Sequence, residues 1–383
     1  MIKIITIIGA RPQIIKAAAI SRAIRNNFRA QINEIILHTG QHYDTNMSQV
    51  FFDELGIPQP DYQFQINGNT AEKQMEEMEK QIGIVLEKEK PNGVLVYGDT
   101  NSTFAGAKAA YSKKYPLIHI EAGLRSWNKD MPEERNRVYA DSVSTLLFSP
   151  TETGLNNLIQ EGFSLHNIPP HSHSNPKIYH CGDIMYDNSM FFSELADEKT
   201  TILKRLNLQN EKFILATIHR NTNTDNKENL NAIIDALLHI CDSHPIKIVL
   251  PLHPRTKKML GELLDKEKTR KLESQPKIQI IEPVSFLDMI ALEKNCILVM
   301  TDSGGVQKEA FYFKKPCVVL RTETEWTELV ECGAAILAKS GDAKKIYESV
   351  HAFLNQRPQF FPAFYGDGQA AEFICKEIIK YIP

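Results

Sequence analysis

The sequence predicts an α/β protein with doubly wound parallel sheets in two lobes, and three observations support this class. Short β-branched runs alternate with longer amphipathic segments along almost the whole chain, which is typical of parallel strands joined by crossover helices. The same alternation starts again after residue 210. The chain has 383 residues, more than one hydrophobic core usually holds, so we expect two domains of roughly 150–200 residues.

The first series of elements alternates regularly up to a polar loop. Its strands are expected in short, continuously apolar runs at 2–8, 34–38, 93–97, 116–120, 145–149 and 177–181. Its helices are expected at 12–26, 46–55, 70–89, 102–114 and 132–142. The segment 164–176 contains three histidines and three prolines and is expected to be irregular. A metal site is not expected there, because no carboxylate or cysteine completes a ligand set.

The second series repeats the pattern in the other half of the chain. Its strands are expected at 213–218, 246–252, 278–281, 297–301 and 317–320. Its helices are expected at 227–241, 285–294, 303–313 and 342–356. A last helix, at about 367–381, follows the proline- and aromatic-rich segment 358–365.

Composition excludes several classes of protein. The 44 basic and 47 acidic residues give a net charge of −3, which is unlike a nucleic-acid binder or a polybasic membrane protein. The hydrophobic fraction of 42 % supports packed cores and excludes disorder. The six cysteines are scattered without a CxxC pair, so neither a disulfide framework nor a zinc knuckle is expected. No run approaches the roughly 18 apolar residues of a membrane span, and the apolar N-terminus lacks a cleavage site. We therefore expect a cytoplasmic protein.

The end of the first strand carries the first candidate site. In open parallel sheets, ligands bind at the carboxyl ends of the strands. Gly9 permits a tight turn, and the helix that follows presents unpaired N–H groups to an anion, with Arg11 and Lys16 adding positive charge. The turn contains no GxGxxG dinucleotide fingerprint, and a purely structural role for it remains open.

Three carboxylates follow strand ends or open a helix in the first lobe. Asp99 and Glu121 come just after apolar strands, and Glu133 lies in the first turn of an expected helix. Each has an ordinary structural explanation, as a helix cap or as a favourable charge at a helix N-terminus. Because all three converge on one sheet edge, we expect them to supply general acid and base groups.

The second lobe carries a candidate diphosphate site. His219 follows its first strand, where a packing role is the ordinary alternative. Ser303, Gly304 and Gly305 form a strand-to-helix turn whose N–H groups suit a diphosphate. Glu309, about one and a half turns further on, is placed to reach a ribose diol.

Taken together, these segments resemble one family, the non-hydrolysing UDP-N-acetylglucosamine 2-epimerases. The resemblance runs from residue 2 to about 381, and its most specific blocks are His-Ile-Glu-Ala-Gly-Leu-Arg and Thr-Asp-Ser-Gly-Gly. The matching segments, in order, are 9–16, 98–100, 119–125, 132–137, 219–220, 301–309 and 365–370. The resemblance implies a GT-B fold of two Rossmann-like lobes with the active site between them. It places the catalytic lobe at 1–183 plus 364–383 and the UDP-binding lobe at 184–363.

The resemblance also implies a reaction and a set of residues. UDP is eliminated across C1–C2 of a UDP-2-acetamido sugar, and it adds back to the bound 2-acetamidoglycal while C2 is reprotonated on the opposite face. No nicotinamide, metal or other cofactor takes part. The implied catalytic residues are Asp99, Glu121, Glu133 and His219. The implied UDP-sugar-binding residues are Arg11, Lys16, Arg137, His219, Ser303, Gly304, Gly305, Glu309 and Arg321. Which carboxylate is the acid and which the base stays open.

Two positions depart from the usual pattern of the family. Gln13 stands where the family usually has Glu, which removes a charge near the expected phosphate loop. The Asn-Thr-Asn sequence at 221–223 stands where Arg-Glu-Asn or a similar sequence is usual, which alters the mouth of the second lobe.

Three further segments resemble one branch of the family. They are 40–44, 126–131 and 321–326. The branch converts UDP-2,3-diacetamido-2,3-dideoxyglucuronate from the gluco to the manno isomer, which makes this uronate the alternative substrate. A uronate requires an extra cation near C6, and the candidates are Arg125, Lys129 and Arg321.

Three other functions remain open. A GT-B glycosyltransferase shares the lobes and the nucleotide site but needs an acceptor. A hydrolysing epimerase releases free N-acetylmannosamine, and a non-catalytic nucleotide-sugar sensor binds without exchanging the C2 proton. The family further implies a homodimer whose ligand is a UDP-sugar, with no nucleic-acid or membrane partner.

Overall fold

The computed structural model describes residues 1–41, 56–66 and 70–382, and the chain divides into two compact units. The first unit comprises Met1–Asn188 and Ala363–Pro383, and the second comprises Ser189–Pro362. The helix expected at 46–55 lies outside the described residues, as does most of the segment 40–44. The first unit therefore takes its residues from both ends of the sequence.

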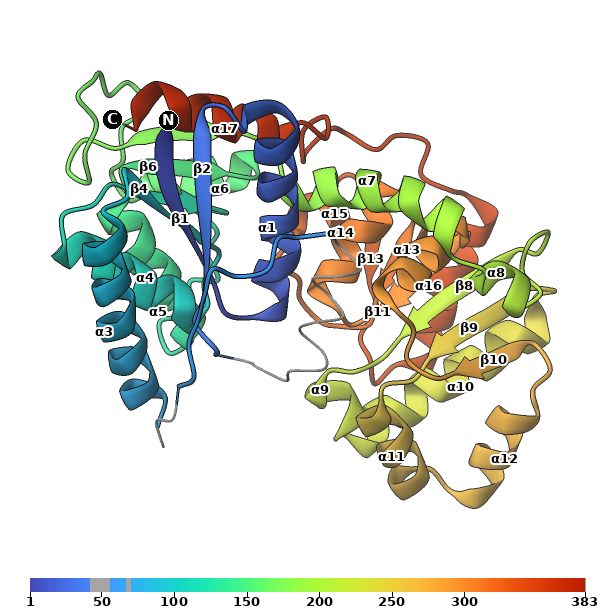
Figure 1. Ribbon diagram of the computed structural model, residues 1–383. Helices are drawn as coiled ribbons and strands as arrows, with labels where there is room; N and C mark the ends of the chain where they lie inside the picture. The colour runs from blue at the N-terminus through green and yellow to red at the C-terminus, as the bar shows by residue number, and fades with distance from the viewer. Residues whose placement is uncertain (42–55, 67–69, 383) are drawn as a thin grey trace. The chain divides into compact units, whose positions relative to one another are not determined.

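The first unit is built on a parallel sheet with the order β3-β2-β1-β4-β5-β6-β7 (Figure 1). The strands are β1 (Ile2–Ile8), β2 (Ile32–His38), β3 (Tyr62–Gln63), β4 (Gly93–Tyr97), β5 (Leu117–Ile120), β6 (Leu146–Ser149) and β7 (Lys177–His180). Every described pairing is parallel, and most strands are buried along their length, which explains their continuous apolar sequences. The strand order reverses between β1 and β4, so a ligand crevice is expected at their carboxyl ends.

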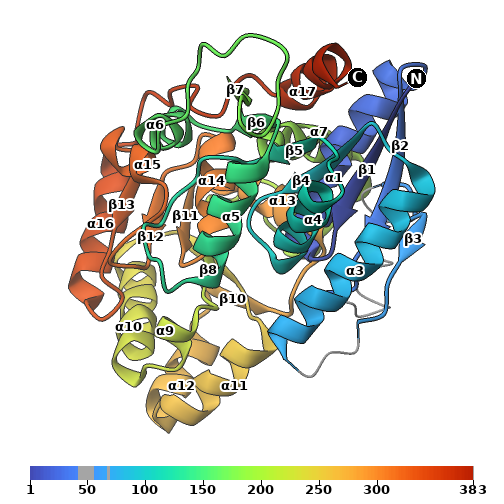
Figure 2. The same cartoon turned by 90° about the vertical axis from the view of Figure 1, so that its left-hand side faces the viewer.

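Helices cover both faces of this sheet. One face packs on a chain of neighbouring helices, α3 (Ala71–Glu89), α4 (Asn101–Ser112) and α5 (Pro132–Val143). The core on that face includes Ile7, Met78 and Val96. The other face carries α1 (Arg11–Ala23), the single π-turn η1 (Ile24–Phe28) that continues it, and α17 (Ala370–Tyr381). Figure 2 shows α3, α4 and α5 side by side, and α6 (Glu152–Gln160) packs against β6 and β7.

The last helix is anchored through its N-terminus. Asp187, in α7 (Ile184–Lys199), accepts hydrogen bonds from the backbone N–H groups of Ala370 (3.2 Å) and Ala371 (2.7 Å). Burial of this carboxyl outweighs the two donors and raises the pKa of Asp187 to about 6. The helix also buries Ile374 and Ile378 in the first unit.

The second unit repeats the architecture with a parallel sheet in the order β10-β9-β8-β11-β12-β13. The strands are β8 (Phe213–Thr217), β9 (Lys247–Pro251), β10 (Ile278–Ile281), β11 (Leu298–Thr301), β12 (Cys317–Val319) and β13 (Ala335–Leu337). One helical layer consists of α9 (Asn221–Thr224), α10 (Lys227–Ser243), α11 (Pro254–Leu263), α12 (Lys266–Ser274) and α16 (Ala343–Asn355). A second group of contacting helices consists of α8 (Ile202–Arg205), α13 (Phe286–Asn295) and α14 (Gly304–Tyr312), and α15 (Thr327–Glu331) packs beside β13. The order reverses between β8 and β11, the second place where a ligand crevice is expected.

Two parallel sheets with helical layers confirm the predicted fold class. The prediction omitted the two shortest edge strands, β3 and β13, and several surface helices, among them α6, α7, α11 and α12. The loop 164–176 is irregular apart from one bridge, and His171 and His173 pack edge-on against Tyr381 and Tyr111. Among the described residues, no helix is long and apolar enough to cross a membrane. Within that same part of the chain, no group of three His, Cys, Asp or Glu side chains could hold a metal ion.

Candidate active site

Gln13 organises the turn between β1 and α1. Its side-chain oxygen accepts hydrogen bonds from the N–H groups of Gly9 (2.9 Å) and Ala10 (3.2 Å). Its amide nitrogen donates to the Tyr97 carbonyl and to Thr103 Oγ1, both at 3.0 Å. An ionised glutamate has no N–H to donate to the Tyr97 carbonyl, so the neutral amide fits this site. The departure at Gln13 therefore lies in a buried link between β1 and β4.

The turn after β5 holds Glu121 in an ion pair with Lys16. The backbone of Glu121 has a φ of +72°, in the left-handed region that residues other than glycine rarely adopt. Its carboxylate bonds to Lys16 Nζ, and both side chains are largely buried. Gly98 leaves room for the pair, because a Cβ on Gly98 would lie 2.9 Å from Glu121 Oε2 and 3.2 Å from Lys16 Nζ. The structure thus brings two predicted site residues together at the ends of β4 and β5.

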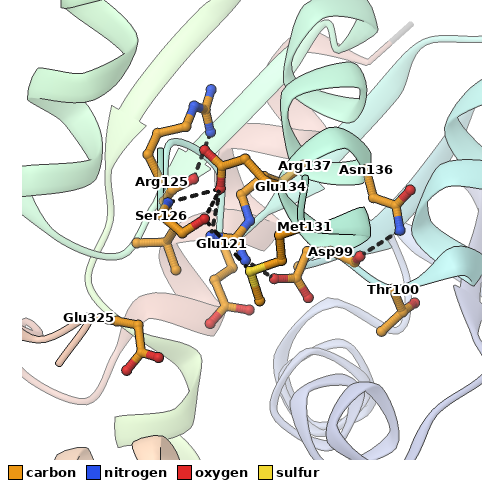
Figure 3. Close-up of polar contacts among 12 residues, drawn as sticks. Asp99, Thr100, Glu121, Arg125, Ser126, Met131, Glu134, Asn136, Arg137 and Glu325 are labelled. Atoms are coloured by element: carbon orange, nitrogen blue, oxygen red, sulfur yellow. Dashed lines mark hydrogen bonds and ion pairs between the residues drawn. The ribbon is translucent and has the colours of Figure 1, made fainter. Parts of the chain in front are cut away.

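Asp99 lies beside this pair and has its own cation. Arg137, in α5, forms an ion pair with the Asp99 carboxylate, which is about one-third exposed. Asn136 donates from its amide nitrogen to the Asp99 carbonyl at 2.9 Å, which fixes the turn on α5. Figure 3 shows the carboxylates of Asp99 and Glu121 projecting to the same side of the strand ends. Two carboxylates, each with a cation, therefore face one region.

The two adjacent glutamates of α5 differ in their surroundings. Glu134 is buried and accepts from the N–H of Ser126 (2.8 Å), the Ser126 hydroxyl (2.8 Å) and the N–H of Trp127 (3.1 Å). These bonds tie the loop after β5 to the start of α5 (Figure 3). Glu133, the predicted catalytic residue, is exposed at the N-terminus of the same helix. The structure therefore gives Glu134 a structural task and leaves Glu133 facing solvent.

A buried charge cluster supports the turns from behind. His119 Nδ1 lies 2.7 Å from Asp141 Oδ1 and Nε2 lies 2.8 Å from the Gly98 carbonyl oxygen. The ring is thus held between a carboxylate oxygen and a backbone carbonyl oxygen. Burial favours the neutral form of Asp141, but His119 and Arg125 outweigh it and hold the pKa of Asp141 below its usual value. Arg125 also pairs with Glu161, so its guanidinium is committed to two carboxylates.

In the second unit, Asp302 holds the end of β8. It accepts from the backbone N–H groups of His219 and Arg220, each at 3.1 Å, and from the side chain of Asn223 at 2.9 Å. His219 Nδ1 also lies 3.1 Å from Asp302 Oδ1, and the imidazole is about half exposed. Burial opposes ionisation of Asp302, but the bonds from His219, Asn223 and Arg220 lower its pKa below the usual value. The side chain of Asn223 also donates to the Leu320 carbonyl, so it points into the unit and joins Asp302 to the end of β12.

The turn between β11 and α14 presents N–H groups. Ser303 is the N-cap residue, and the glycines at 304 and 305 occupy the first helical positions. The turn is braced by Gln307, whose amide donates to the Ser303 carbonyl at 3.1 Å, and by Trp326, whose indole donates to the Gly304 carbonyl at 3.0 Å. No acidic residue occupies the first turn of α14. This end of the helix therefore favours an anion.

Arg321 and Glu309 have carboxyl neighbours in the second unit. Arg321 donates from two guanidinium nitrogens to Glu325, at 2.8 and 3.0 Å, and is mostly buried. Glu309 lies on α14 beside Glu293 of α13. The predicted binding roles of both residues stay predictions.

Sequence reasoning assigned no supporting role to the residues that hold the site from within. Asp302, Asp141 and Gln13 fix the turns that carry His219, Gly98 and Arg11. The sequence does contain a pattern that indicates a role for Asp302, because this residue directly follows a strand and precedes the Ser-Gly-Gly turn. Asp141 lies inside an ordinary amphipathic helix, and only the fold brings it to His119.

Two Rossmann-like sheets in one chain, each with polar groups gathered at the strand ends beside its switch point, define a protein of the GT-B fold class. The solved structure of a UDP-GlcNAc 2-epimerase from Methanocaldococcus jannaschii, in complex with UDP-GlcNAc and UDP, shares this fold. It is similar to the chain with a TM-score of 0.80 and 39 % identity over 99 % of each chain. The chain belongs to the UDP-N-acetylglucosamine 2-epimerase family, because the family model of that description matches residues 24–379.

Two curated relatives cover almost the whole chain. A UDP-2,3-diacetamido-2,3-dideoxy-D-glucuronate 2-epimerase from Pseudomonas aeruginosa is 47 % identical over 99 % of both sequences. A UDP-N-acetylglucosamine 2-epimerase from Methanocaldococcus jannaschii is 41 % identical, again over 99 % of both. The predicted family and the predicted enzyme class, a UDP-sugar 2-epimerase and hence an isomerase, are confirmed.

Proposed function

We propose that this protein inverts C2 of a UDP-2-acetamido sugar without releasing the free sugar. The observation that carries the proposal is the pair of carboxylates, Asp99 and Glu121, at adjacent strand ends, each with its own cation. A C2 proton is weakly acidic, so one group must remove it and another must return a proton on the opposite face. Carboxylates in different surroundings can divide these tasks.

We assign the proton transfers at C2 to the first unit. Glu121 is largely buried against Lys16, whereas Asp99 is more exposed and Glu133 faces solvent at a helix N-terminus. The three carboxylates therefore experience different solvation, which is what separate acid and base roles require. Lys16 and Arg137 pair with Glu121 and Asp99, and Arg11 begins α1, so the first unit supplies positive charge that can stabilise the departing diphosphate.

We assign the nucleotide to the second unit. The N–H groups at Ser303, Gly304 and Gly305 suit the diphosphate. His219, held by Asp302, is half exposed and available to the leaving oxygen, and Glu309 binds the ribose diol. Binding UDP tightly matters in a non-hydrolysing reaction, because the same UDP must stay in place to add back to the glycal.

We propose UDP-2,3-diacetamido-2,3-dideoxyglucuronate as the substrate, with UDP-N-acetylglucosamine as the second candidate. The identity of 47 % to a relative named for the uronate supports this order, and relatives named for UDP-N-acetylglucosamine follow at 46 % and 41 %. Of the three cations considered for the C6 carboxylate, Arg125 and Arg321 are paired with carboxylates inside their own units. Lys129 is exposed in the loop after β5, and we assign the C6 contact to it.

The test is proton NMR of each UDP-sugar incubated with the enzyme in D2O. We expect deuterium at C2 of both epimers of the uronate and slower or no exchange with UDP-N-acetylglucosamine. Turnover with retention of the C2 proton would contradict the elimination mechanism, and rapid epimerisation of UDP-N-acetylglucosamine alone would reverse the order of substrates. Release of free 2-acetamido sugar would indicate a hydrolysing enzyme.

We further propose that the protein is a homodimer that works in the cytoplasm. The homodimer follows the family resemblance and is tested by sedimentation velocity at micromolar concentration. A single species with the mass of one 383-residue chain would contradict it.

A further inference from the structure

A buried carboxyl group in the second unit is left without a donor. Glu293 lies on the core side of α13 with 1 % of its surface exposed. Among the described residues, no donor group hydrogen-bonds to either of its carboxyl oxygens. Its side chain interacts with that of Glu309 on α14. Burial, and then the adjacent Glu309, raise the pKa of Glu293 well above its usual value.

The two carboxyl groups can satisfy each other in only one way. Two ionised carboxylates are both acceptors and repel each other at hydrogen-bond distance. If one holds a proton, it donates to the other, and the pair shares a single charge. Glu293 is the more buried of the two, since Glu309 is only partly buried, so the proton resides on Glu293 and the charge on Glu309.

We propose that Glu293 is a neutral, buried acid that positions Glu309 by donating a hydrogen bond to its carboxylate. This inference rests on the proposed function, in which Glu309 accepts the hydroxyls of the ribose. One oxygen of Glu309 takes the hydrogen bond from Glu293, which fixes the orientation of the carboxylate. The carboxylate is then already oriented when the diol binds, so less conformational entropy is lost on binding.

The position of Glu293 supports a specific task rather than simple packing. Its neighbours in α13, Ile290, Ala291 and Leu292, are apolar and buried, so a methionine or leucine would fill the same space without burying a polar group. The helices α13 and α14 are in contact, so the proposed hydrogen bond links the core to the helix that begins at the Ser-Gly-Gly turn. Glu293 itself is too deep to touch a ligand and is therefore a positioning residue.

The test compares Glu293→Met, which removes the donor, with Glu293→Gln, which keeps a neutral donor of the same shape. Calorimetric titration measures the Kd of the full-length protein for UDP and for 2′,3′-dideoxy-UDP, which lacks the ribose diol. We expect Glu293→Met to weaken UDP binding about tenfold, the cost of about one hydrogen bond, and to leave the dideoxy ligand unaffected. Glu293→Gln should bind UDP within about twofold of the wild type. Glu267→Met, on the exposed face of α12, controls for the substitution itself.

Turnover gives a second readout. For Glu293→Met the KM of the UDP-sugar should rise about tenfold while kcat falls much less, because the lost interaction contributes equally to ground and transition states. The infrared spectrum at neutral pH should contain the carbonyl band of a protonated carboxyl, which disappears in Glu293→Gln.

Several results would overturn the inference. They are UDP binding by Glu293→Met that equals the wild type, equal weakening of both ligands, or absence of the protonated carboxyl band. If the wild-type protein itself does not distinguish UDP from its dideoxy analogue, the ribose role of Glu309 is wrong and the inference falls with it. The D2O exchange experiment then decides separately whether the epimerase function survives.

Discussion

At the scale of single residues, the turn after β5 concentrates the unusual conformations of the first unit. Glu121 and Gly98 both have positive φ angles, and their backbones bring the Glu121 carboxylate over the end of β4. A left-handed conformation costs a residue such as glutamate about 1–2 kcal/mol, which the surrounding structure must offset. His119 holds the Gly98 carbonyl, and the N–H of Glu121 donates to the Phe148 carbonyl at 3.0 Å.

Gly98→Ala is expected to reduce kcat strongly and to reduce stability only slightly. The new methyl group would lie 2.9 Å from Glu121 Oε2, so the carboxylate must move away from Lys16. Gly162→Ala is the matched control, because Gly162 also has a positive φ but has open space around its Cβ position. Both variants should lose about 1 kcal/mol of stability, and only Gly98→Ala should lose activity. Equal activity in the two variants would contradict the close packing of Glu121 on Gly98.

Glu121→Gln should lower turnover by about 10²–10⁴-fold, which is the usual contribution of a general acid or base. The amide has the same shape, so the melting temperature should stay near that of the wild type. Glu134→Gln provides the contrast, because Glu134 accepts three hydrogen bonds and its loss should lower the melting temperature. Turnover by Glu121→Gln at the wild-type rate would remove Glu121 from the catalytic set.

At this scale the sequence predicted the residues that follow strand ends, such as Asp99, Glu121 and His219. It could not predict the residues that position them, because a partner such as Asp141 is separated from His119 by 22 positions and shares no local pattern with it. Nor could it predict that Arg321 is paired with Glu325, since the spacing of four residues occurs equally in exposed helices.

At the scale of elements, the buried strands were predictable and the edges were not. Strands such as β1 and β8 are apolar at nearly every position because both faces are covered. The edge strands β3 and β13 have only two and three residues, too few for a pattern to emerge. The sequence places the lobe boundary between residues 183 and 184 and predicts no helix directly after it, whereas residues 184–199 form α7, whose Asp187 anchors α17.

The pKa of Asp187 predicts a pH dependence of the α17 anchor. Below about pH 4 the carboxyl is protonated in both folded and unfolded chains. Between about pH 4 and 6 only the folded state retains the proton, so stability falls as pH rises, by about 3 kcal/mol in total. Above about pH 6 the loss is complete.

Asp187→Asn should remove this slope, since the amide does not titrate. The free energy of opening α17, from hydrogen–deuterium exchange corrected for the intrinsic rate, is the measurement. Between about pH 4 and 6 the opening free energy of the wild type should fall relative to that of the variant. Above about pH 6 the two curves should run parallel. Parallel curves throughout that window would show that the anchor does not titrate there.

At the scale of the whole molecule, the net charge does not describe the charge at the two candidate regions. The net charge of −3 excludes a basic surface, yet both candidate regions have cations or N–H groups at strand ends. Composition therefore only excludes classes of partner. The two series of alternating strands and helices predict the fold. The limits of the units depend on contacts between distant segments, which no local pattern encodes.

Removal of residues 363–383 should unfold the first unit selectively. The lost helix buries Ile374, Cys375 and Ile378, worth about 5 kcal/mol or more at about 25 cal/mol per Å², a large share of the stability of a domain. Scanning calorimetry of the shortened chain should retain one cooperative transition, from the second unit. Ile374→Ala, expected to cost about 2–5 kcal/mol, gives the graded version of the same effect. Two unchanged transitions would show that α17 does not support the first unit.

The return of α17 to the first unit also sets the order in which the protein can be completed during synthesis. The ribosome must produce all of Ser189–Pro362 before the residues of α17 exist. The second unit is continuous and can fold while it is being made, whereas the first unit, whose strands are made earlier, must wait for α17. The unit that carries the proposed acid and base groups thus depends on a segment that is made only after the whole of the second unit.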